Sequence, residues 1–507
     1  MGNLVQQSIL DELKQAGYFS LSVDSTPDVS HVDQLTVIVR YLSLKTGLPV
    51  ERFLTFLTLE DHSGSSMANL VVNYLVQECA IDFSNCRGQS YDNAANMSSK
   101  YNGIQHHILE INKFAGYMPC AGHSLNLIGK AASDSCLEAV SFFGIIQETY
   151  NFFSASTKRW ATLTNCLPTG AKVPKSLSDT KWETHATAVS AVKDNYTHIQ
   201  DALSKLESNE DEKGETRLQA RNILSKMDEL EFLFMLELWN YILSEFHKTS
   251  KALQDPEISL ATCANLYTSL SEFVDSAKNM FDRFENKAKA QDPDLDYRSV
   301  SRRTRKRKRH FDEQGEPEKE LLSPRDSFKK QSFDPIVDAL SDNLAKRATA
   351  YTFAAKTFTF LVDLNCTKEM ISSGVQNIIQ AYPQDVDKTL TAELKHFHLY
   401  VKQKCPNKET FTHQELLSII FEDKIQPAFP NIELILRLFL SLMVTNCSGE
   451  RSFSQLKRIK GDLRSTLAQE KLNAFSIMCI ESDKLREVSF DDLIQSFAAS
   501  KSRKKLF

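Results

Sequence analysis

The sequence lacks an excess of positive charge, and this limits how the chain as a whole can meet nucleic acid. Its 65 Asp and Glu residues outnumber 60 Lys and Arg residues, which gives a formal net charge of -5 and a pI of about 6.2. A chain with this balance has no overall attraction to a polyanion. Contact with nucleic acid would therefore need a local basic patch, and one dense basic run exists at 302–309.

Long hydrophobic runs and a secretion signal are also missing. The most apolar run, IELILRLFLSLMV at 432–444, is shorter than a membrane span and contains Glu433 and Arg437, so it predicts a buried helix. The first residues, MGNLVQQSIL, do not show the basic-then-apolar pattern of a signal peptide, and Gln6 stands where a myristoylation motif has Ser or Thr. We expect a protein with no membrane partner.

The ten cysteines show no short, even spacing of the kind found in disulfide frameworks, which favours a reducing compartment. With 507 residues, of which 42% are hydrophobic, the chain can bury a large core, and its length predicts roughly two to four domains. These properties indicate a globular protein with a core that needs no disulfides.

The hydrophobic period changes repeatedly between 18 and 132, and the order of the changes predicts the fold. Strands are predicted at 18–23, 33–44 and 51–60, followed by a helix at 66–79, a strand at 81–90, a helix at 93–112, a strand at 114–119 and a helix at 123–134. Three strands therefore precede the first helix. This order favours an α/β fold with an RNase H-like sheet over a doubly wound nucleotide-binding sheet.

The remainder of the chain has mostly helical periodicity, over 135–285 and 335–425, and predicts a large all-α insertion. Between these segments, 285–333 is polar and predicts a disordered linker. It contains the basic residues Arg302, Arg303, Arg305, Lys306, Arg307, Lys308 and Arg309. Such a run can be a nuclear-localisation signal or a non-specific phosphate contact, and its place in a linker favours nuclear localisation.

Two acidic residues follow predicted strands that are neighbours in this topology. Asp24 follows the first strand and Asp92 the fourth, so their carboxylates would face one another at the same edge of the sheet. Close carboxylates repel, and a divalent cation such as Mg²⁺ stabilises their ionised forms. Each residue alone has a simpler explanation, because Asp24 could cap a turn before Pro27 and Asp92 could cap the helix that begins at Asn93.

The segment NCSGERSFSQLKRIKGDLRSTLAQEKLNAF, at 446–475, resembles the carboxy-terminal dimerisation block of hAT-superfamily transposases. The matching residues are Ser448, Glu450, Arg451, Phe453, Ser454, Leu456, Lys457, Arg464, Ser465, Leu472 and Asn473. Two positions depart from the pattern, because Lys471 replaces an Arg and Met443 replaces a frequent Pro.

Four amino-terminal blocks resemble the same family in their usual order. They are LSVDST with Asp24, YDNAANM with Asp92, PCAGHSLNL with Cys120 and His123, and LSDTKWETH at 177–185, in which Lys181 replaces an Arg. The resemblance covers 18–185 and 420–485 and is closest to transposon-derived vertebrate proteins of the zinc finger MYM-type 1-like group.

This resemblance implies an RNase H-like core that is split by an α-helical insertion. The implied divisions are 1–134 for the first part of the core, 135–425 for the insertion, 426–485 for the dimerisation region that completes the core, and 486–507 for a tail. The resemblance also implies that Asp24, Asp92 and Glu450 form a metal triad for Mg²⁺ or Mn²⁺. Alone, Glu450 could instead be a carboxylate favoured by the dipole at a helix N-terminus.

Further site residues follow from the resemblance. Cys120 and His123 supply only half of a zinc site, whose other ligands would have to be His106, His107 or Cys136, so we favour His123 as a catalytic-site neighbour. A buried core pair is the simpler alternative. Trp182 is expected to stack on an extruded base, unless it is an ordinary core tryptophan. Lys181 and Arg451 are the implied phosphate contacts, although lysine lacks the planar, bidentate geometry of arginine.

Two functions remain open from the sequence. The chain begins almost directly at the first predicted strand, without a Cys/His cluster that would read transposon ends. This absence, together with Lys181 and Met443, favours a domesticated nuclear protein that forms a homodimer or a higher homo-oligomer. The intact triad favours the alternative, a metal-dependent DNA strand-transferase with DNA as its partner.

Overall fold

The computed structural model describes residues 1–178, 182–298 and 322–499. It divides into two compact units. The first consists of Met1–Ser124, Ala252–Asn265 and Thr349–Phe507, and the second of Leu125–Lys251 and Leu266–Ala348. Residues from both ends of the chain thus fold into the first unit.

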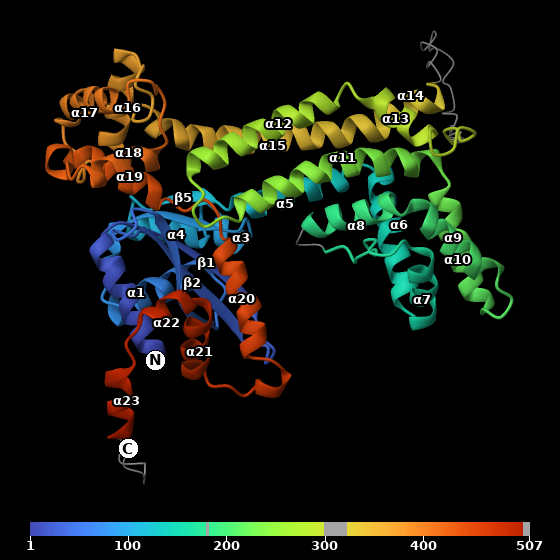
Figure 1. Cartoon of the computed structure of the whole chain (residues 1–507), viewed down its shortest axis with the longest axis horizontal. Helices are drawn as coiled ribbons and strands as arrows, with labels where there is room; N and C mark the ends of the chain where they lie inside the picture. Colours follow the sequence, from blue (N-terminus) through green and yellow to red (C-terminus); the bar gives the residue numbers. More distant parts are fainter. Residues whose placement is uncertain (179–181, 299–321, 500–507) are drawn as a thin grey trace, which may run out of the picture. The chain divides into compact units, whose positions relative to one another are not determined.

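A five-stranded mixed sheet forms the centre of the first unit (Figure 1). Its strands are β1 (Phe19–Pro27), β2 (Asp33–Leu42), β3 (Pro49–Leu59), β4 (Cys86–Tyr91) and β5 (Gly116–Pro119), in the order β3-β2-β1-β4-β5. The pairs β1/β2 and β2/β3 are antiparallel, whereas β1/β4 and β4/β5 are parallel. This sheet and the long, largely helical remainder confirm the predicted fold class, an RNase H-like α/β core with a large helical insertion.

The first half of the chain contains helices of both units. They are α1 (Gly2–Ala16), α2 (Gly64–Asn73), α3 (Ala95–Ser98), α4 (Ile104–Ile111), α5 (Ala121–Ser133), α6 (Leu137–Ser154), α7 (Thr157–Cys166), α8 (Trp182–Asp194), α9 (Tyr196–Ser208), α10 (Gly214–Met227) and α11 (Leu230–Leu253).

In the second half, every regular element among the described residues is helical. The helices are α12 (Leu260–Ala277), α13 (Phe281–Lys289), α14 (Pro324–Phe328), α15 (Asp334–Thr359), α16 (Lys368–Ala381), α17 (Leu390–Lys404), α18 (His413–Glu422), α19 (Pro430–Ser441), α20 (Cys447–Ile459), α21 (Gln469–Ile480), α22 (Ser482–Glu487) and α23 (Asp491–Ala498). In the described part of the chain, no helix has the length and apolar content that crossing a membrane requires.

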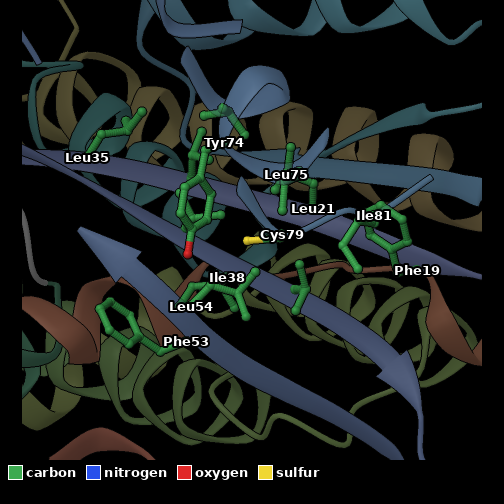
Figure 2. Packing of buried hydrophobic residues seen from close by; sticks show 14 of the residues in the cluster. Phe19, Leu21, Leu35, Ile38, Phe53, Leu54, Tyr74, Leu75, Cys79 and Ile81 are labelled. Carbon is green, nitrogen blue, oxygen red and sulfur yellow. The ribbon is translucent and has the colours of Figure 1, made fainter. Parts of the chain in front are cut away.

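Alternation along β1 separates an apolar face of the sheet from a polar one. Phe19, Leu21 and Val23 are fully buried in the main hydrophobic core, together with residues of α1, α2 and α4. Figure 2 shows Phe19 and Leu21 gathered with side chains of the segment that follows α2. The intervening residues, Ser20, Ser22 and Asp24, point to the opposite face, because side chains alternate along a strand.

The polar face of the sheet is covered by α19 and α20, which pack on β1 and β2 (Figure 1). Helix α21 packs on β3 and α1, and its Asn473 bonds to the backbone N–H and carbonyl oxygen of Phe56 in β3. Helix α19 is buried along most of its length, which confirms the buried helix predicted within 432–444. Helix α20 packs on β1. Glu450, in the first turn of α20, therefore comes close to the strand that carries Asp24.

Several predicted elements differ from the structure. Helix α1 precedes the first strand, so the expectation that the chain begins almost directly at β1 is wrong. Its buried residues at helical spacing, including Val5, Ile9 and Leu13, carried the signal. The helix predicted at 93–112 is two helices, because the chain turns back at Gly103, where a Cβ would lie 2.6 Å from the Ser99 nitrogen.

The predicted linker and tail also contain ordered elements. Helix α14 and the following π-helical turn, Lys329–Phe333, fall within the predicted linker at 285–333, because Phe328 and Phe333 pack into an aromatic cluster around Phe234. Helices α22 and α23 lie at the end of the chain, the latter within the predicted tail. The basic run at 302–309 lies outside the described residues. The two compact units differ from the domain divisions implied by the resemblance, which remain a prediction.

Candidate functional site

Three carboxylates come together where the pairing between β1 and β4 ends. The two strands are parallel neighbours, with Ser22 opposite Ser90. Asp24 lies two positions further along β1, which continues to Pro27 and so does not stop before Asp24 as predicted, and Asp92 directly follows β4. Glu450 lies in the first turn of α20, which packs on β1. The tertiary structure thus brings together residues that are 426 positions apart in the sequence.

The electrostatics of Asp24 record how close these groups are. Its pKa is raised from 3.8 to about 7, chiefly by burial and in addition by the negative charges of Asp92 and Glu450. The backbone N–H of Ser25 donates a 2.9 Å hydrogen bond to the Asp24 Oδ1 and partly offsets this effect. Asp24 therefore lies in a cluster of carboxylates whose negative charges disfavour its ionised form.

Asp92 does not cap a helix beginning at Asn93, because α3 begins at Ala95, but it stabilises the turn before that helix. Its Oδ1 accepts a 3.0 Å hydrogen bond from the backbone N–H of Ala94, as expected of an acidic residue in a turn before a helix. Its charge nevertheless acts on Asp24. The local turn therefore orients Asp92 without taking it away from the cluster.

Asn446 is the residue that sets the position of Glu450. Its Oδ1 accepts a hydrogen bond of 2.5 Å from Ser22 Oγ, and its Nδ2 donates one of 3.3 Å to the Val23 carbonyl oxygen. Its own carbonyl oxygen accepts the backbone N–H of Glu450 at 3.2 Å. Asn446 is 2% exposed. The beginning of α20 is thus attached directly to the strand that carries Asp24.

A second network fixes the other side of the same helix turn. Arg40 of β2 is fully buried and forms a 3.1 Å ion pair with Glu51 of β3, while its Nε donates to the Leu440 carbonyl oxygen at the end of α19. Glu51 accepts a hydrogen bond from Ser448 Oγ, which also accepts one of 2.7 Å from Arg451 Nη2. The residues around Glu450 in the block Ser-Gly-Glu-Arg are therefore held by β2 and β3.

The carboxylate cluster fits hard divalent cations by its donor set, because Mg²⁺ and Mn²⁺ prefer oxygen ligands. Among the residues that the structure describes, however, the oxygens of Asp24, Asp92 and Glu450 do not all lie within 4.8 Å of one another. A site with two cations roughly 4 Å apart distributes its ligands between them and does not require such close approach. The donor chemistry thus agrees with the predicted metal, which remains a prediction.

Cys120 lies near the same cluster, at the start of α5. Burial raises the pKa of its thiol to about 12, and the charges of Glu450 and Asp24 contribute in the same direction. Its sulfur accepts the backbone N–H of Asn446 at 3.1 Å. His123, in the first turn of α5, is half-buried. The placement of Cys120 agrees with the expectation that this pair of residues lies close to the carboxylates.

The predicted nucleic-acid contacts are placed less favourably. Trp182 is 5% exposed, and its ring stacks on His185 with centroids 4.2 Å apart. This is the environment of the alternative, a core tryptophan, and a base would need to displace His185 to stack there. Arg451 is exposed and donates to Ser448 and to the Gln254 carbonyl oxygen. Lys181 lies outside the described residues.

Two residues that position the first turn of α20, Asn446 and Arg40, were not predicted from the sequence. Asn446 stands just before a helix, where its side chain would ordinarily be expected to cap that helix. It bonds to β1 instead, which no local pattern indicates. Arg40 did carry a signal, because an arginine inside the apolar strand segment VIVRYL must find a buried anion if the strand is central.

Comparisons with known proteins agree with this arrangement. Residues 1–103 match the family described as ZMYM1/FAM200, RNase-like domain, and residues 397–483 match the hAT family C-terminal dimerisation region. The chain therefore combines an RNase-like domain with an hAT dimerisation region and is derived from an hAT transposase.

Two curated proteins are similar over almost the whole chain. Both are named "52 kDa repressor of the inhibitor of the protein kinase", and they come from Homo sapiens and Mus musculus. Identity is 22% over 502 residues and 23% over 503 residues, respectively, which is 94% of this chain in each case. The chain spans 64% of the length of these relatives.

We predict that Asp24 makes the metal-free protein less stable as the pH rises. Its folded-state pKa of about 7 exceeds the ordinary 3.8, so the folded protein holds a proton that the unfolded chain has already released. The stabilisation is complete below about pH 4 and is lost as the pH rises to about 7. In chelator-treated protein, the melting temperature should fall less between about pH 5 and pH 8 in Asp24→Asn than in the unmutated chain.

The matched control is Asp11→Asn, which removes an exposed carboxylate from α1 and should leave the pH dependence unchanged. Identical slopes for the unmutated protein and Asp24→Asn would show that Asp24 ionises normally.

Proposed function

We propose that this transposase-derived chain is a nuclear protein that works as a self-associating scaffold. The observation that carries the proposal is the match of residues 397–483 to the hAT dimerisation region. A domesticated protein of this kind would keep the fold and the dimerisation surface of its ancestor, whether or not it kept the chemistry.

The geometry limits which part of this region can contact a second copy. Helix α19 supplies the most apolar sequence of the region, but its large apolar side chains are buried within the chain, apart from the half-buried Leu434. On α21, by contrast, Lys471, Phe475 and Cys479 are exposed at a spacing of four residues and therefore share one face of the helix. Phe475 is 45% exposed. We assign the contact between copies to this face of α21.

The self-association test replaces an apolar contact by a charge. Phe475→Glu should shift the full chain from dimer to monomer in sedimentation velocity experiments at micromolar concentration, with at least a roughly tenfold weaker dimer. Phe353→Glu is the matched control, because Phe353 is 77% exposed and lies outside the matched region. A chain that is monomeric before any substitution, or a dimer indifferent to Phe475→Glu, would contradict the assignment.

Nuclear localisation is supported by the dense basic run at 302–309 in an otherwise acidic protein. Replacing all seven Lys and Arg residues of this run by Ala should leave the protein in the cytoplasm of transfected cells. The control replaces seven exposed Lys and Arg residues elsewhere in the chain. Retention in the nucleus after loss of the run would remove this part of the proposal.

A second candidate function, metal-dependent DNA strand transfer, is favoured by the clustering of three carboxylates around Asp24. Asp24, Asp92 and Glu450 would hold the cations, while Asn446 keeps Glu450 against β1. A divalent metal, when bound, supplies activation of an attacking hydroxyl and charge stabilisation at the leaving oxygen of a phosphodiester. His123 would lie beside the reacting DNA.

Repulsion among the three carboxylates would also make the stability of the protein depend on metal binding. Without a cation, the carboxylates repel one another, so Asp92→Asn should raise the melting temperature of the metal-free protein. The same substitution should abolish stabilisation by Mn²⁺, because the cation loses a ligand.

The test of strand transfer uses the purified full chain, Mn²⁺ and a nicked hairpin DNA. Asp92→Asn and Glu450→Gln should each lower cleavage or joining at least about 100-fold, whereas Glu470→Gln, an exposed carboxylate of α21, should not change it. Absence of any Mn²⁺-dependent strand breakage, combined with a melting temperature indifferent to Mn²⁺, would leave the scaffold as the function.

A further inference from the structure

Three potential metal ligands converge on one face of α4, apart from the carboxylate cluster. His106 Nε2 lies 3.4 Å from Glu110 Oε1, and His107 Nδ1 lies 3.0 Å from Glu110 Oε2. One ligand atom from each of the three residues lies within 4.8 Å of the others. Helix geometry makes this possible, because residues three and four positions apart are neighbours on a helix surface, so that both histidines reach the same glutamate.

The core fixes the orientation of this helix. Ile104 and Ile108 of α4 are fully buried in the main hydrophobic core, and α4 packs against α2. The three polar side chains therefore lie towards solvent, with exposed fractions of 35% for His106, 27% for His107 and 59% for Glu110. An ion from solution could reach them without any rearrangement of the core.

The spacing of the ligand atoms allows one small ion to reach all three residues. Zinc lies about 2.0–2.1 Å from imidazole nitrogen and about 2.0–2.2 Å from carboxylate oxygen, so two ligands on opposite sides of the ion are at most about 4.3 Å apart and two tetrahedral ligands about 3.3 Å apart. Each imidazole nitrogen lies 3.4 or 3.0 Å from a different oxygen of Glu110, and one ligand atom from each residue lies within 4.8 Å of the others. Zinc and imidazole are well matched, and a carboxylate completes a common ligand set.

We propose that His106, His107 and Glu110 form a zinc site on the surface of α4, with a fourth position open to water or to an external ligand. No member of this site belongs to the Asp24 cluster. The ion would connect the first and last turns of α4, an eight-residue helix that has little stability of its own. It would thereby stabilise the segment that follows Asp92 in the chain.

A hydrogen-bonded cluster without metal is the competing explanation. In that case each histidine donates a ring N–H to Glu110, and zinc has no higher affinity for α4 than for any other exposed histidine. The two explanations differ in what the removal of both imidazoles does to zinc binding, and this difference decides the test.

The experiment titrates the metal-stripped full chain with Zn²⁺ in competition with a chromophoric chelator. The double variant His106→Ala/His107→Ala should weaken the tightest zinc binding at least about tenfold. His62→Ala is the matched control, because His62 Nε2 is exposed and contacts a single carboxylate, Asp33, at 3.2 Å. Its zinc affinity should equal that of the unmutated chain.

A second measurement separates loss of the site from loss of the fold. Zn²⁺ should slow amide hydrogen exchange at 104–111 in the unmutated chain and should not do so in Glu110→Gln, which keeps a hydrogen-bond acceptor but loses the charge. Equal zinc affinity in the double variant and in the unmutated chain, or exchange at 104–111 that is indifferent to Zn²⁺, would overturn the proposal.

Discussion

The attachment of Asn446 to β1 is the interaction on which the candidate site depends. Its side chain bonds to Ser22 and to the Val23 carbonyl oxygen, and its backbone begins the helix that carries Glu450. Because all these groups are buried, their hydrogen bonds cannot be exchanged for water without cost. These hydrogen bonds fix the distance between β1 and α20 to within the tolerance of a hydrogen bond. Local sequence cannot fix this distance, because the insertion separates the two segments.

The buried pair of Arg40 and Glu51 reinforces this attachment from the neighbouring strands. Two buried ions are costly to desolvate, and the removal of one partner from such a pair typically destabilises a protein by about 3–5 kcal/mol. Here the cost is offset by carbonyl acceptors on Arg40 from Leu440 and Ile258, and by the hydroxyl of Ser448 on Glu51. The network therefore explains Ser448 and Arg451 as residues that orient the first turn of α20, independently of any contact with DNA.

The same region of the chain thus has two physical roles. Within the first unit, 397–483 supplies α19 and α20, which cover the polar face of the sheet and bring Glu450 to it, and α21, which packs on β3 and α1. The proposed contact between copies uses the exposed face of α21 around Phe475, because the large apolar side chains of α19 are buried apart from the half-buried Leu434. Most of this dimerisation region therefore packs within the first unit, and only its exposed side chains can contact a second copy.

The sequence by itself determined the succession of strands and the buried helix near 432–444. These depend on hydrophobic period and on turn residues, which act over a few positions. Helix α1 also has a local signal in its hydrophobic spacing, although it was not predicted. The sequence did not determine the continuation of β1 past Asp24, the break at Gly103 or the burial of Trp182, because packing between distant segments decides them. The approach of Glu450 to Asp24 was inferred from resemblance to a family, and its physical basis, Asn446 and Arg40, became visible only in three dimensions. Tertiary structure decided the site because long-range hydrogen bonds and buried charges have no local signature in the sequence.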